Sequence, residues 1–122
     1  MEHSLLVSFL DGMTPPKDFS REIKHEVDAC EEGFRSPANV GYILMTDGPQ
    51  ITVTREHMKR LLQCLLDETI PWMSANYTGD CLMMSGDFHP LDEAVTEAIE
   101  FVADDSRPPT PDEIRVVIQT LD

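Results

Sequence analysis

The amino-acid sequence predicts an α+β fold in which helices cover one face of a small, mostly antiparallel sheet. Short apolar runs that end at glycine, proline or aspartate indicate buried strands, and longer segments with apolar residues at helical spacing indicate amphipathic helices. Their order along the chain is β-α-β-β-α-β, the ferredoxin-like arrangement, and two C-terminal helices follow it. A chain of 122 residues corresponds to one domain, so we expect residues 1–122 to fold as a single unit.

The first half of the chain supplies three of the expected strands and one helix. An apolar run precedes Asp11-Gly12, a turn signal, and so predicts a buried strand. Phe19, Ile23 and Val27 recur at helical spacing, and Gly33 follows them as a helix stop. The expected elements are a strand at 4–10, a helix at 18–32, and strands at 40–46 and 51–54 joined by a hairpin loop at 47–50.

The second half predicts three helices and one strand. Thr54 is suited to cap the first helix, and Thr110 and Glu113 form a capping box, with Pro111 between them, at the start of the last helix. The expected elements are helices at 54–68, 91–103 and 110–122 and a strand at 80–85. The β-branched run at 116–118 leaves a terminal strand as the alternative for residues 110–122.

The charge of the chain restricts the classes of partner. The sequence holds 23 acidic and 9 basic residues, a net charge of −14, and 10 of the acidic but only 2 of the basic residues lie in 81–122. Phosphates repel an acidic surface, so we expect no direct nucleic-acid binding and no attraction to anionic lipid. A basic protein partner or a bound cation fits this charge, as does acidity that serves only solubility or a salt-rich cytoplasm.

Signals for targeting, membrane insertion and cofactor binding do not emerge from the sequence. No positively charged segment precedes the first apolar run, and no apolar stretch reaches the ~20 residues of a membrane span. Cys30, Cys64 and Cys81 share no metal or redox spacing and are typical of free thiols in a reducing compartment. We therefore expect a cytoplasmic protein that has no membrane segment and binds neither a metal nor another cofactor.

An acidic stripe follows the helix expected at 91–103. Glu93, Glu97, Glu100 and Asp104 stand at i, i+4, i+7 and i+11, along one side of a helix, and Asp105 continues the run. Like charges at this spacing destabilise a helix, and its C-terminal end disfavours Asp104 and Asp105. Because local stability does not favour this pattern, we predict a surface that binds a basic protein. A solvated acidic face is the alternative.

Two aromatic residues lie in the segment 70–77, which the sequence predicts to be a loop. Trp72 is the only tryptophan of the chain, and Tyr77 is one of its two tyrosines. Both residue types anchor protein interfaces, because they bury a large area with few rotatable bonds. We predict that Trp72 and Tyr77 contact the partner. The alternative is that Trp72 folds back to close the core of a small domain.

No motif predicts catalysis. Cys81 and His89 are near enough in sequence for a thiolate pair, and Asp80 and Asp87 bracket the predicted strand at 80–85 as possible walls of a pocket. Neither pair has the spacing of a catalytic or metal-binding motif, and a cysteine in a buried strand is more commonly a small core residue. We expect no enzymatic activity.

Size, acidity and the lack of motifs predict a small inhibitor that masks the basic surface of a partner such as a nuclease, a toxin or a defence effector. Immunity proteins and phage-encoded inhibitors have this character. Ala94–Phe101 followed by Arg107-Pro108 also resembles the C-terminal helix and Arg-Pro turn of some small bacterial immunity proteins. The alternative is a ferredoxin-like small-molecule-binding or regulatory domain that self-associates as a homo-oligomer.

Overall fold

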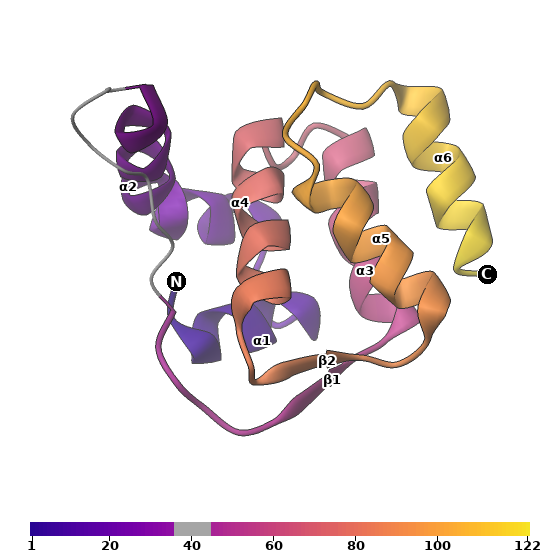
Figure 1. Cartoon of the computed structure of the whole chain (residues 1–122), viewed down its shortest axis with the longest axis horizontal. Helices are drawn as coiled ribbons and strands as arrows, with labels where there is room; N and C mark the ends of the chain where they lie inside the picture. Colours follow the sequence, from indigo (N-terminus) through magenta and orange to yellow (C-terminus); the bar gives the residue numbers. More distant parts are fainter. Residues whose placement is uncertain (36–44) are drawn as a thin grey trace.

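A computed structural model describes residues 1–35 and 45–122, with the backbone alone for 31–35 (Figure 1). Over these residues the chain forms six helices and two short strands. In chain order they are α1 (His3–Leu10), α2 (Pro16–Arg35), β1 (Ile51–Val53), α3 (Arg55–Leu66), α4 (Trp72–Met84), β2 (Phe88–Pro90), α5 (Glu93–Ala103) and α6 (Pro111–Thr120).

The predicted ferredoxin-like fold with a mostly antiparallel sheet is wrong. The strands of the described residues number two, each has three residues, and they pair in parallel, with Thr52 opposite His89. Among the described residues, β1 pairs with the distant β2. The hairpin predicted around 47–50 needs a partner strand that falls mostly outside the described part of the chain. The strand predicted at 40–46 lies outside the described residues as far as residue 44, and residues 45 and 46 are not in a strand.

Residues 4–10, predicted to be a strand, lie in the helix α1. Leu6, Phe9 and Leu10 are fully buried, at positions that share one side of a helix. The side of α1 opposite these residues carries only Ser4 and Ser8 and no Asp, Glu, Lys or Arg, so the helical period is weak in the sequence. Phe9 stacks on Phe19 of α2 with ring centroids 4.2 Å apart, and this contact holds α1 against α2.

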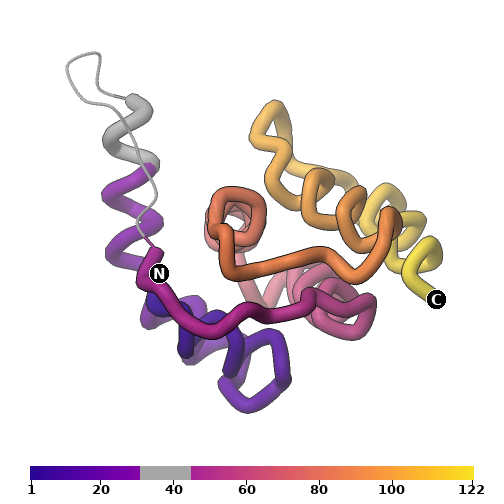
Figure 2. Tube along the Cα trace, turned by 60° about the horizontal axis from the view of Figure 1, so that its bottom comes forward, coloured from indigo at the N-terminus to yellow at the C-terminus, as the bar shows by residue number. Residues whose placement is uncertain are grey.

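The loop predicted at 70–77 and the strand predicted at 80–85 both lie largely in one helix, α4. This helix runs between α2 and α5 (Figures 1 and 2) and buries eight of its thirteen residues. A helix that is covered on most sides lacks the alternation of apolar and polar faces by which a helix is recognised. Gly79 brings α4 close to α5, because a Cβ atom there would stand 2.8 Å from the backbone nitrogen of Ala103.

The four helices predicted from the sequence are confirmed by α2, α3, α5 and α6. Helix α2 continues past Gly33, the predicted stop. Thr54 caps α3 by accepting a hydrogen bond from the backbone N–H of His57, whose ring nitrogen Nδ1 accepts in return from the N–H of Thr54. The capping box of Thr110 and Glu113 begins α6, so the alternative of a terminal strand is wrong.

One hydrophobic cluster takes residues from every helix and from both strands. Each strand leads directly into a capped helix, β1 into α3 and β2 into α5. Arg55, at the start of α3, pairs at 2.9 Å with Asp92, which caps α5 by accepting from the N–H of Val95. This arrangement fixes the direction of α5 and therefore the direction in which its exposed side chains point.

Candidate partner-binding surface

The acidic stripe lies on α5, directly opposite the side that packs into the core. At 3.6 residues per turn, Glu93, Glu97 and Glu100 fall within an arc of about 60°. All three are exposed, whereas the opposite side of the helix is buried. The buried residues of α5 are Val95, Ala98, Ile99 and Val102. We refer to Glu93, Glu97 and Glu100 as the acidic face.

The acidic face has no neutralising partner among the residues that the structure describes. The ion pairs of residues 1–30 and 45–122 include Asp18, Asp28, Asp92 and Glu113, and none involves a member of the acidic face. Glu93 lies in the first turn of α5, where the helix dipole favours an anion, but Glu97 and Glu100 gain nothing from that end. Three carboxylates therefore remain exposed without a compensating cation from the described side chains.

Asp104 and Asp105, at the C-terminal end of α5, both have local roles. The carboxylate of Asp104 accepts a hydrogen bond of 2.9 Å from the backbone N–H of Ser106, and this bond lowers the pKa of Asp104. Burial, and then the charge of Asp105, raise the pKa of the Asp80 carboxyl on α4 to about 6. Both aspartates are exposed, but Asp104 also holds the turn after α5 through its hydrogen bond with Ser106.

The two aromatic residues predicted to be anchors lie in different environments. Tyr77 is 5% exposed and belongs to the core, where burial, followed by the neighbouring Cys81 and Glu26, raises the pKa of its hydroxyl. A partner cannot reach it on the surface of the folded chain. Trp72, in contrast, is half-buried at the start of α4 and lines a surface groove.

This groove, which we call the Trp72 groove, has a volume of about 410 Å³ and lies between the α3–α4 connection and the start of α6. Of the ten described residues that line it, nine are apolar and Glu68 alone is charged. One wall consists of the end of α3, Ile70, Pro71 and Trp72. The facing wall consists of Pro108, Pro109, Pro111 and Ile114.

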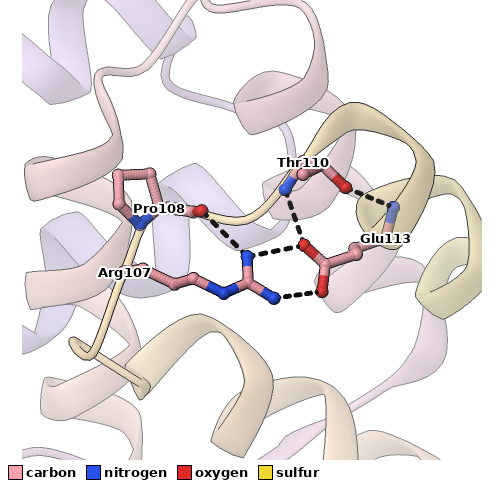
Figure 3. A network of polar contacts seen from close by, with 4 residues as sticks. All are labelled: Arg107, Pro108, Thr110 and Glu113. Carbon is pink, nitrogen blue, oxygen red and sulfur yellow. Dashed lines mark hydrogen bonds and ion pairs between the residues drawn. The ribbon is translucent and has the colours of Figure 1, made fainter.

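The proline-rich wall is held in place by a network of polar contacts (Figure 3). Arg107 binds the carboxylate of Glu113 through both of its terminal nitrogens, at 2.8 and 2.7 Å. The same carboxylate accepts from the backbone N–H of Thr110 at 2.9 Å, and the N–H of Glu113 donates to the Thr110 hydroxyl. These contacts lower the pKa of Glu113 to about 2, Arg107 being the largest cause. The contacts thus tie the loop before α6 to the first turn of that helix.

Glu68 is a residue that sequence analysis missed. It follows Asp67, the C-cap of α3, and its φ of 61° is the only positive value among the non-glycine residues described. Its N–H donates to the carbonyl of Leu65, and the N–H of Thr69 donates to that of Cys64. This is the pattern of a Schellman cap, in which glycine usually holds the left-handed position. A glutamate gives no sequence signal for that conformation.

Among the described residues, no hydrogen bond or ion pair joins the members of either pair considered for catalysis. Cys81 is buried in α4, where burial raises the pKa of its thiol to about 12, whereas His89 is exposed in β2 and bonds to the side chain of Gln50. Asp87 accepts hydrogen bonds from the N–H of Gly48 and from Gln50, and so shapes the loop before β1. Within the described ranges no group of three or more His, Cys, Asp or Glu side chains is placed to hold a metal ion.

Comparisons with known proteins give no match: no family model, no curated protein and no solved structure is significantly similar to this chain. None of the helices in residues 1–35 and 45–122 has the length and apolar character needed to cross a membrane.

Proposed function

We propose that this chain binds a basic protein through the acidic face of α5 and thereby masks the functional surface of that partner. The observation that carries the proposal is the exposure of Glu93, Glu97 and Glu100, opposite the core, without an ion pair to any described residue. A nuclease, a toxin or another defence effector is the class of partner we propose. Binding, without catalysis by this chain, is the activity.

The competing explanation is acidity for solubility alone. Placing Glu97 four residues after Glu93 costs about 0.2–0.5 kcal/mol in helix stability, an amount that many proteins tolerate. The helix energy therefore does not decide between the two explanations. The two explanations differ in the association rate that they predict. A local acidic face raises the association rate with a basic partner, and this acceleration falls as salt screens the charges.

The experiment begins with capture of the partner by the tagged chain from its native lysate, at low and at high salt, and identification by mass spectrometry. Association rates are then measured between the purified partner and the Glu93→Gln, Glu97→Gln, Glu100→Gln triple variant. We expect association to slow about tenfold or more at low salt and to lose most of its salt dependence. Dissociation should change less.

A matched control removes three charges from other parts of the surface. Glu22→Gln, Asp47→Asn and Glu56→Gln give the same net charge, and all three side chains are exposed. Equal rates for the two triple variants would contradict a local acidic face and would support acidity for solubility. The masking itself is measured by adding the chain to the partner at equal concentration. The partner should lose activity, and a higher concentration of the α5 triple variant than of the wild-type chain should be needed for the same loss.

A further inference from the structure

The Trp72 groove combines features that suit one kind of side chain. Its walls are aliphatic and prolyl, which matches a methylene stem, and it contains the indole of Trp72. Its single charged lining residue is a carboxylate, Glu68, and no ion pair within the described ranges includes it. A long cationic side chain can satisfy all three features, since its stem is apolar and its charged end binds both an aromatic face and a carboxylate.

The conformation of Glu68 is the second observation. Glycine adopts a φ of 61° without steric penalty, and glycine is the usual residue at this position of a Schellman cap. The chain instead carries a larger, charged side chain there, exposed and lining the groove. Residues held in sparsely populated backbone conformations by the surrounding structure are concentrated at ligand-binding sites.

We infer that the Trp72 groove binds an arginine side chain of the basic partner. Its guanidinium group would stack on Trp72 and donate to the carboxylate of Glu68, while its stem would contact the prolines of the facing wall. Arginine suits the site better than lysine, because its planar group both stacks on an aromatic ring and binds a carboxylate through two parallel hydrogen bonds. The inference rests on the proposed function, which supplies a basic partner, and it names a second contact point outside the acidic face.

The groove can be tested without the partner. N-acetyl-arginine amide is the probe, and Trp72, as the only tryptophan, gives the only indole N–H signal in the proton NMR spectrum of the folded chain. We expect this signal to shift saturably at probe concentrations of about 1 mM and above. The corresponding citrulline amide is uncharged but similar in shape and should give little shift. An equal shift with citrulline, or none with arginine, would overturn the inference.

Variants at Glu68 separate binding from folding. Glu68→Gln should weaken binding of the arginine probe about fivefold. The matched control is Asp67→Asn, which removes a neighbouring exposed carboxylate that does not line the groove, and it should leave the affinity nearly unchanged. Glu68→Gly should abolish the carboxylate contact and yet raise the melting temperature, because it relieves the left-handed backbone. An affinity that is the same in all three variants would refute a role for Glu68.

The outcomes distinguish this inference from the proposed function. If the arginine probe binds but the α5 triple variant associates normally with the partner, the proposed role of the acidic face is wrong and the inference about the groove is supported. If the α5 variant associates slowly but the probe does not shift the indole signal, the proposed role of the acidic face is supported and the inference about the groove is wrong. Equal binding of N-acetyl-lysine amide would overturn the assignment to arginine.

Discussion

Replacing Gly79 by alanine tests how closely α4 and α5 pack. Alanine is favoured over glycine inside a helix by about 1 kcal/mol, so an isolated helix would gain stability. The added Cβ, however, would stand 2.8 Å from the backbone nitrogen of Ala103 and 3.0 Å from Cγ1 of Val102. Backbone atoms of a packed helix cannot move aside cheaply, which puts the cost near the upper end of the roughly 1–3 kcal/mol seen for overpacked cores. The expected net effect is a loss of about 2 kcal/mol.

Urea denaturation followed by circular dichroism measures this loss, and the melting temperature should fall by roughly 8 °C for a chain of this size. Gly86→Ala is the matched control, because nothing lies within 4 Å of its added Cβ, and it should change stability by less than about 0.5 kcal/mol. If Gly79→Ala proves as stable as the wild type, helix propensity prevails and the close approach of α4 to α5 is incorrect.

Three further predictions concern other parts of the fold. Because the pKa of Asp80 is raised from 3.8 to about 6, the stability that its protonated form provides is lost as pH rises between these values. Asp80→Asn should therefore stabilise the chain by about 1 kcal/mol at pH 7, after allowance for screening by water, and should have no effect below pH 4. A difference in melting temperature between variant and wild type that stays the same at every pH would contradict this. The pKa of Glu113 is lowered from 4.5 to about 2, so its contact with Arg107 stabilises the fold above pH 4.5 and is lost as pH falls through 2. Glu113→Gln should lower the melting temperature at pH 7, and the difference from wild type should shrink toward pH 2; equal melting temperatures at pH 7 would show that the network adds no stability. Phe9→Ala should lower the free energy of unfolding in urea titrations by about 3–5 kcal/mol, because Phe9 is fully buried against Phe19. Phe9→Leu should lower it by less than about 1.5 kcal/mol. Similar losses for the two variants would show that the lost side-chain volume is not the cause.

The sequence was most informative where one face of a helix meets solvent. The helices α3, α5 and α6 carry both a periodic apolar stripe and a capping residue, Thr54, Asp92 and Thr110 respectively. The same period predicts that Glu93, Glu97 and Glu100 share one side of the helix, and the structure exposes all three. Local patterns are sufficient in such helices because burial alternates within each turn.

Burial on most sides removes that information. Helix α4 has a solvent-exposed end at Met83 and Met84 but buries a continuous run at 74–79, so its residues show neither a helical nor a strand period. The sequence consequently predicts Tyr77 in a surface loop, whereas the residue lies in the core. Glu68 was missed for a different reason. Its left-handed backbone results from the chain reversal between α3 and α4, and a glutamate at that position does not indicate such a turn in the sequence.

The parallel pairing of β1 with β2 also has a consequence for the order of assembly. Residues 54–87 lie between the two strands, so the hydrogen bonds of the pair close a long loop. Three residues on each side are too few to hold that loop closed before α3 and α4 have docked, so we expect the two strands to pair late in folding. Both α3 and α5 start directly from this pair and are joined there by Arg55 and Asp92. A fluctuation that separates the strands would fray both helix starts together, as one cooperative unit that includes the first carboxylate of the acidic face.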